Sequence, residues 1–227
     1  MKYIYTNASE ALWRKVTKSD KQEARNVYKR LKDSKNKKET FTLERPKIVM
    51  NAIEVLYFPY DDKDGVSWYW IDGKNVEVSI KQFNILVSRN DMVKKELKRI
   101  KTQLYLGKRP VEERIKAMHD YICEDVEYDY SDKGYYSLYD TLFGKKVVCM
   151  GYSILFKALC DISDITCQCV NNGTHMWNRI MFNNEPHYLD ATWDDALGND
   201  KYFMKPESEF YKTHPKHTQV DWYGWIV

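Results

Sequence analysis

The chain has 227 residues, of which 43% are hydrophobic, 15% aromatic and 30% charged. This composition excludes a disordered or low-complexity protein, and the length predicts one or two domains. No apolar run approaches the roughly 20 residues that cross a bilayer, so no integral membrane segment is expected. The net charge of +3 is uneven, because residues 1–50 are basic and the remainder is mildly acidic.

The basic cluster near the N-terminus does not indicate a nucleic-acid partner. Lys32, Lys35, Lys37 and Lys38 lie where a helix is expected to end, and lysines at that position are normally solvated. No nucleic-acid-binding motif accompanies the charge. The first residues show no signal peptide, so we expect a cytoplasmic protein unless a signal has been removed and the protein is secreted or at the cell surface.

Residues 1–90 contain patterns for helices and one hairpin. A capping box at Ser19 and Gln22 and the apolar spacing that follows predict a helix over 19–33. Pro46 and a second apolar face predict another helix that runs through Leu56. Asp72-Gly73 separates two runs rich in β-branched and aromatic residues, 66–71 and 76–87, which predicts a two-stranded ribbon.

Residues 91–227 change from helical to strand-like periodicity. Helical spacing covers 93–104, 115–126 and, after a tyrosine-rich loop and a short helical turn, 149–161. Three strand-like runs follow, at 165–170, 175–182 and 187–192. Helices followed by an antiparallel sheet predict an α+β fold.

One of the five cysteines lies in a position that favours reactivity. Cys149 comes where a loop gives way to an apolar helix, and backbone N–H groups at a helix N-terminus stabilise a thiolate. Cys123 and Cys160 fall within helices and are expected to be small core residues. Cys167 and Cys169 share a strand face, but they lack the second ligand pair of a zinc site, and no metal is expected there.

A histidine and an aspartate on consecutive strands complete a catalytic pattern. With a hairpin loop of two residues, Asn183-Asn184, or of four, 183–186, the side chains of His175 and Asp190 point to the same face of the sheet, whereas a loop of three residues would separate them. A thiolate nucleophile needs a histidine to carry its proton and a carboxylate to orient that histidine. The other histidines, His119, His187, His214 and His217, show no comparable pattern.

These segments together resemble a known family. The run YSLYDTLFGKKVVCMGYSILFKALCDISDITCQCV, followed by THMWNRI and HYLDATWDD, is similar to the transglutaminase-like superfamily, in particular its bacterial branch of cysteine proteases. The likeness covers roughly residues 91–227. Two positions depart from the usual pattern: Val147 stands where the family has glycine, and Met176 stands where it has alanine.

The resemblance implies a papain-like core at 91–227, with a central helix packed on an antiparallel sheet, behind an N-terminal accessory region at 1–90. It implies that Cys149 is the nucleophile, His175 the general base and acid, and Asp190 the orienting carboxylate. Tyr139 is a candidate oxyanion donor, and Tyr152, Trp177 and Trp193 are candidates for the walls of the cleft. No metal and no organic cofactor are expected.

The implied activity is acyl transfer on amide bonds of a peptide or protein substrate, through a thioester on Cys149. We favour a peptidase or amide hydrolase. Two alternatives stay open: a cross-linking transglutaminase, in which an amine replaces water as the acceptor, and a non-catalytic interaction module. The sequence does not predict the acceptor, the substrate or the oligomeric state, because cleft shape and water exclusion decide the acceptor.

Overall fold

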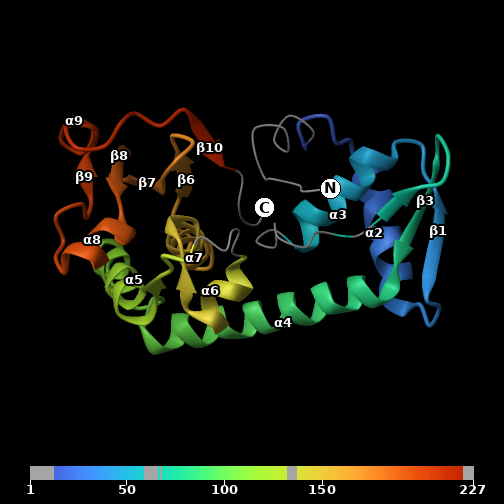
Figure 1. The fold of residues 1–227 in the computed structure, drawn as a ribbon, viewed down its shortest axis with the longest axis horizontal. Coiled ribbons are helices and arrows are strands. Elements are labelled where there is room, and N and C mark those ends of the chain that lie inside the picture. Colours follow the sequence, from blue (N-terminus) through green and yellow to red (C-terminus); the bar gives the residue numbers. More distant parts are fainter. Residues whose placement is uncertain (1–12, 59–65, 67, 132–136, 222–227) are drawn as a thin grey trace. The chain divides into compact units, whose positions relative to one another are not determined.

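The computed structural model describes residues 13–58, 66, 68–131 and 137–221 (Figure 1). The chain divides into two compact units, one holding the described residues up to Asp91 and the other those from Met92 onward. Helix α4 (Ile80–Gln103) begins in the first unit and continues into the second. No helix among the described residues is long and apolar enough to cross a membrane.

The first unit combines two helices with a small antiparallel sheet. Helix α2 (Lys18–Asp33) and helix α3 (Pro46–Tyr57) accompany strands β1 (Lys38–Thr42), β2 (Trp68–Trp70) and β3 (Asn75–Ser79). The strand order is β1-β3-β2, and every pair is antiparallel. The two predicted helices and the ribbon around Asp72-Gly73 are therefore confirmed.

Three details of the first unit differ from the prediction. The capping box of α2 is formed by Thr17 and Asp20, because the side chain of Thr17 accepts the N–H of Asp20 and the carboxylate of Asp20 accepts the N–H of Thr17. The second strand of the ribbon ends at Ser79, and the apolar residues from Ile80 onward belong to α4. Strand β1 was not predicted.

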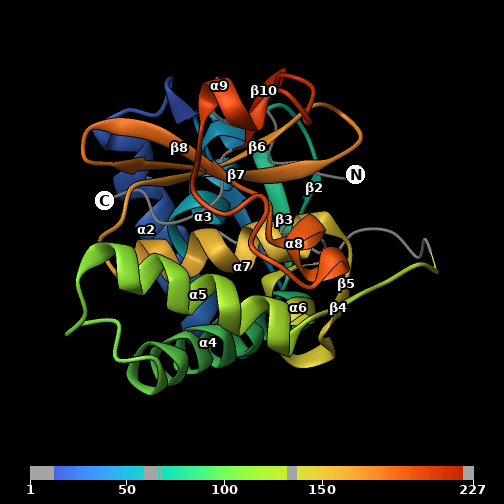
Figure 2. The same ribbon diagram turned by 90° about the vertical axis from the view of Figure 1, so that its left-hand side faces the viewer.

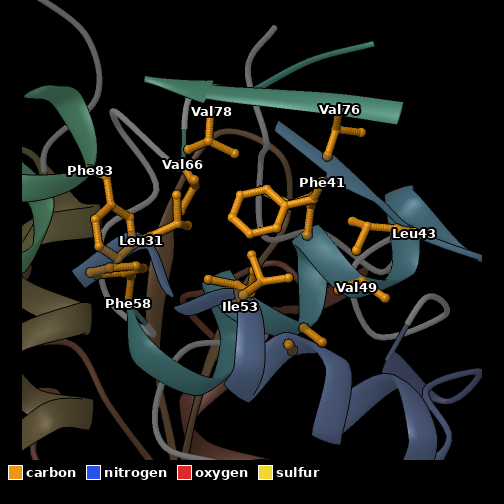
Figure 3. Close-up of a cluster of buried hydrophobic side chains, with 14 of the residues drawn as sticks. Leu31, Phe41, Leu43, Val49, Ile53, Phe58, Val66, Val76, Val78 and Phe83 are labelled. Carbon is orange, nitrogen blue, oxygen red and sulfur yellow. The ribbon is translucent and has the colours of Figure 1, made fainter. Parts of the chain in front are cut away.

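An apolar core lies between the helices and the sheet of this unit. Figure 3 shows Phe41 of β1, Ile53 of α3 and Val78 of β3 pointing toward one another, with Leu31 of α2 and Phe83 of α4 at one side. All five side chains are at most 6% exposed. Their burial holds together segments that the chain separates by up to 52 residues, from Leu31 to Phe83.

The second unit is built around helix α7 (Cys149–Asp161) and a five-stranded antiparallel sheet. The sheet has the order β10-β6-β7-β8-β9, with the bounds Gln219–Asp221, Cys167–Asn171, Met176–Phe182, Glu185–Leu189 and Lys205–Pro206. Helix α7 packs on β6 and β7, and helix α5 (Val111–Asp125) also contacts α7 (Figure 2). The predicted α+β class, with a central helix on an antiparallel sheet, is confirmed.

Shorter elements surround this sheet and helix. They are helix α6 (Leu138–Gly144), helix α8 (Ala191–Leu197) and helix α9 (Glu207–Phe210), together with strands β4 (Glu127–Tyr128) and β5 (Lys146–Val147), which pair in parallel. Cations fix the C-terminal end of α7, where Lys101 donates to the carbonyl of Ile162 and Arg114 to that of Ser163 at 2.8 Å. Positive charge is favourable at a helix C-terminus.

The hairpin between β7 and β8 has the shorter of the two loops considered. Phe182 pairs with Glu185, so the loop is Asn183-Asn184, and both asparagines have positive φ, 51° and 64°. Asparagine tolerates this conformation, which two-residue hairpin turns of this kind require. The predicted third strand ends earlier than expected: Asp190 follows β8, and residues 191–197 form α8.

Candidate active site

Cys149 is the first residue of α7, and its thiol is half-buried. The N-cap residue, Val148, has extended backbone and makes no side-chain hydrogen bond to the first turn. The N–H groups of that turn therefore present their partial positive charge to the thiol without a competing side-chain acceptor at the cap. The predicted position of Cys149 at a helix start is confirmed.

The first turn of α7 approaches the preceding strand closely at Gly151. A Cβ at this position would lie 2.6 Å from the Cβ of Val147 and 2.9 Å from the hydroxyl oxygen of Thr141. Atoms do not approach so closely, so the absence of a side chain at Gly151 allows this packing. The contact fixes the turn that carries Cys149.

His175 lies just before β7, in a turn held by an asparagine side chain. The Oδ1 atom of Asn172 accepts the backbone N–H groups of Thr174 and His175, at 3.0 and 2.9 Å. The imidazole is 17% exposed, and the indole ring of Trp193 stacks on it with a centroid distance of 5.2 Å and an interplanar angle of 21°. The turn and the indole together fix the ring of His175.

Asp190 is the N-cap of α8, and both of its carboxylate oxygens are engaged. Oδ1 accepts the backbone N–H groups of Thr192 and Trp193, at 3.0 and 3.2 Å. Oδ2 lies 2.5 Å from Nε2 of His175 and 3.1 Å from Nε2 of His214. Burial would raise the pKa of this carboxyl, but the hydrogen bonds from His175 and His214 outweigh it and hold the pKa below 3.8.

The electrostatics of His175 couple it to both Asp190 and Cys149. Burial, the largest effect, lowers the pKa of His175, but hydrogen bonds with Asp190 and with Cys149 and the negative charge of both groups raise it to about 9. Because Nε2 faces Asp190, the other ring nitrogen, Nδ1, is left for the thiol. The structure thus brings Cys149, His175 and Asp190 together, and the catalytic roles expected of them stay a prediction.

The other predicted site residues have different surroundings. Trp193 covers one face of His175, as described above, and the ring of Trp177 lies 5.8 Å from His175 but is only 1% exposed. Tyr152 is also 1% exposed, and its hydroxyl donates to Asp195 at 2.6 Å, so it lies in the core and not on an open wall. Tyr139 is half-buried, and its ring contacts Phe143 at 4.8 Å.

Sequence analysis did not identify His214, which follows α9. Its side chain is fully buried between Phe210 and Trp193, with ring centroids 3.9 and 4.0 Å away. Its hydrogen-bond partner, Asp190, is 24 residues earlier in the chain. No local spacing could have indicated this contact, because a coil segment of unpredicted path brings the two residues together.

His119 also forms contacts that the amino-acid sequence did not indicate. Its Nε2 lies 3.1 Å from Oδ2 of Asp194, its Nδ1 lies 3.2 Å from Asp120, and the thiol of Cys123 is 3.8 Å away. Burial lowers the pKa of His119, but the bonds to Asp194, Cys123 and Asp120 raise it to about 10. This cluster joins α5 to α8. Cys123, which was expected to be a core residue, is partly exposed at a small cavity of about 220 Å³ beside His119.

The remaining cysteines include Cys160, for which the predicted burial is confirmed. Cys160, Cys167 and Cys169 are buried, and none of them forms a disulfide within the described part of the chain. The thiol of Cys169 donates to the carbonyl of Ser153 at 3.4 Å. Burial raises the pKa of the Cys160 thiol well above its usual 9.0, which disfavours the reactive thiolate.

Two groups in the described part of the chain have the composition of a metal site, but their contacts are satisfied internally. In the first, His175, Asp190 and His214, the 2.5 Å contact between Nε2 and Oδ2 is a hydrogen bond. Two atoms bound to one zinc ion would lie roughly 3.3 Å apart. In the second, His119, Asp120 and Asp200, the ammonium of Lys116 already lies 2.5 and 3.1 Å from the two carboxylates.

Part of the chain is similar to known proteins. Residues 98–198 match the family model of the transglutaminase-like superfamily. Two curated relatives are similar: the kyphoscoliosis peptidase of Homo sapiens, 25% identical over 45% of this chain, and that of Mus musculus, 23% identical over 63%. The chain spans only 19% and 24% of the length of these relatives.

Two solved structures are also similar. One is described as a TGase, with a TM-score of 0.36 and 13% identity, over 56% of this chain and 44% of that one. The other is a "putative cysteine protease" from Cytophaga hutchinsonii, with a TM-score of 0.37 and 20% identity, over 44% of this chain and 37% of that one. The stretch that matches the family model, residues 98–198, includes Cys149, His175 and Asp190, so this part of the α+β unit is similar to the transglutaminase-like superfamily.

Proposed function

We propose that this protein is a cysteine-dependent amide hydrolase that acts on peptides or proteins. The observation that carries the proposal is the connected set of Cys149 at the start of α7, His175 beside it, and Asp190 with its Oδ2 2.5 Å from Nε2 of His175. This is the order nucleophile, proton carrier and orienting carboxylate that thiol acyl transfer requires. The peptidase named among the relatives supports hydrolysis.

In the proposed reaction, His175 holds the proton of Cys149 and the thiolate attacks the amide carbonyl carbon. The C–N bond breaks as the imidazolium of His175 gives its proton to the leaving amine, and a thioester remains on Cys149. Water then attacks the thioester, His175 takes the proton of that water, and the acid is released as the thiol re-forms. The backbone N–H of Cys149 is the proposed oxyanion donor, because no cap side chain occupies the helix start.

The experiment that tests the proposal follows alkylation of each cysteine by iodoacetamide as a function of pH, with mass spectrometry to separate the sites. We expect the rate at Cys149 to have a midpoint well below the ~8.5 of an ordinary thiol. In His175→Ala that midpoint should rise, because the thiolate loses the imidazolium beside it. The buried thiols of Cys160, Cys167 and Cys169 serve as internal references.

A matched control is available in the same hairpin. His187 is on β8, and its Nδ1 lies 3.3 Å from the carbonyl oxygen of Glu185 and not beside Cys149. His187→Ala should therefore leave the profile of Cys149 unchanged. A titration of Cys149 with an ordinary midpoint that is indifferent to His175 would refute the proposed enzyme. That result would favour the non-catalytic interaction module.

A further inference from the structure

The carboxylate of Asp190 has two imidazole partners on the same oxygen. His175 and His214 both present Nε2 to Oδ2, at 2.5 and 3.1 Å, while Oδ1 is occupied by the two N–H groups at the start of α8. Both lone-pair directions of each oxygen are thus used. If Asp190 served only to orient His175, the imidazole of His175 would be the only one needed on Oδ2.

The described surroundings of His214 suggest no other role for its imidazole. It is 0% exposed and lies between the rings of Phe210 and Trp193, with the ring of Tyr202 edge-on at 4.9 Å. Its second nitrogen, Nδ1, lies 3.2 Å from the hydroxyl of Thr213. An apolar ring would fill this slot without a buried polar group to satisfy, so the imidazole is informative.

We infer that His214 is a positioning residue of the active site, which shares Oδ2 of Asp190 with His175 and so limits how strongly the carboxylate holds the proton of His175. The inference rests on the proposed function, in which His175 must give that proton to the leaving amine. An imidazolium held too firmly is a poor acid, and a carboxylate oxygen that accepts two N–H groups holds each less firmly than one that accepts a single group.

The charges around His175 give the direction of the effect. Asp190 faces the ring of His175 from the end of β8, and Cys149 faces it from the start of α7. The ring of His214 lies 6.3 Å from that of His175. The uncharged rings of Trp177 and Trp193 lie against His175 as well. If His214 is neutral, its removal leaves Oδ2 with His175 as its imidazole partner, and the negative charge of that oxygen then acts more strongly on His175. If His214 is protonated, its removal takes away a like charge. Both cases make the imidazolium of His175 more stable.

The experiment measures the titration of His175 by NMR of the full chain with 13C-labelled histidine, with His175→Ala to assign the signal. In His214→Phe the ring slot stays filled and the donor is lost, and the pKa of His175 should rise by roughly half a unit or more. In His214→Gln an amide N–H can replace the donor, and the titration should return toward that of the unmodified protein. If His214→Phe does not fold, His214→Met fills the same slot.

A matched control separates the hydrogen bond from packing. Phe210→Leu disturbs the same ring stack and leaves the N–H of His214 in place, so it should not move the titration of His175. The inference is overturned by an unchanged or lowered pKa of His175 in His214→Phe, or by shifts of equal size in His214→Phe and Phe210→Leu. The proposed function has a separate readout, because only the alkylation profile of Cys149 in the unmodified protein decides it.

Discussion

At the scale of single residues, the candidate site depends on side chains that serve two purposes. Asp190 contacts His175 with one oxygen and caps α8 with the other. Removal of an aspartate cap alone costs about 1 kcal/mol of helix stability. Substitutions of Asp190 therefore change both the orientation of His175 and the start of α8, whereas substitutions of Cys149 remove the reactive atom and its contact with His175 but leave the cap of α8 in place.

The raised pKa values of two buried histidines predict how stability depends on pH. His175 and His119 have pKa values of about 9 and about 10 in the folded protein, against 6.5 when unperturbed. Each therefore adds stability that is complete below pH 6.5 and is lost as the pH rises through its folded pKa. We expect the free energy of unfolding to fall between about pH 6.5 and pH 10.

Denaturant titrations across this range measure the effect. His119→Gln should remove the part of the slope nearest pH 10, because Gln carries no titratable proton. His187→Gln, at a half-buried ring on β8, is the matched control and should keep the part of the slope nearest pH 10. A stability that stays flat from pH 6.5 to 10 in the unmodified protein would contradict the raised pKa values.

At the scale of elements, the packing of α7 against β5 predicts a sensitive position beside the thiol. A methyl group at Gly151 would overlap Val147, whose backbone leads directly into Val148 and Cys149. We expect Gly151→Ala to cost roughly 1 to 3 kcal/mol of stability through overpacking and to lower the alkylation rate of Cys149, because the first turn of α7 must shift.

Gly144 provides the matched control for this substitution. It lies at the end of α6, and a Cβ there would meet no atom within 4 Å. Gly144→Ala should therefore leave stability and the rate at Cys149 nearly unchanged. Equal behaviour of the two variants would show that the contact with Val147 does not position the cysteine.

The same elements explain which features the sequence could predict. The sequence predicts helix α7 with its observed bounds because apolar residues recur at helical spacing in it, at Ile154, Leu155, Ala158 and Leu159. The approach of His175 to Asp190 followed from the two-residue hairpin at Asn183-Asn184. Residues 80–87 were assigned to a strand because their β-branched and aromatic content outweighed a helical spacing that continues into α4.

The contacts that could not be predicted join residues far apart in the chain. His119 meets Asp194 across 75 residues, and His214 meets Asp190 from a coil segment after α9. Neither pair leaves a periodic signal, since each depends on how α5, α8 and the last coil segment pack. Only the tertiary arrangement brings these side chains together.

At the scale of the whole molecule, the two units have separate apolar cores. The core of the first unit is the cluster around Phe41 and Ile53, and the core of the second includes Trp177 and Tyr188. Because these clusters share no residue, a cavity in one should be felt mainly in its own unit. Ile53→Ala should cost roughly 2 to 5 kcal/mol in the first unit.

Thermal unfolding and Cys149 alkylation together measure this independence. Ile53→Ala should lower the unfolding temperature of the first unit and leave the alkylation rate of Cys149 unchanged at 25 °C. Ile180→Ala is the counterpart in β7 of the second unit, where the side chain is 0% exposed, and it should change the alkylation rate. A fall in the rate in Ile53→Ala would show that the site depends on the first unit.

The double use of Asp190 has a consequence for how such a protein would evolve if its chemistry were no longer needed. Mutation of Cys149 removes a reactive atom but no cap and no buried hydrogen bond that the fold requires. Mutation of Asp190 uncaps α8 and leaves the buried N–H of His214 without its acceptor. Selection for folding alone would therefore keep the aspartate after the cysteine had been replaced. An intact Asp190 is for this reason weaker evidence of catalysis than an intact Cys149.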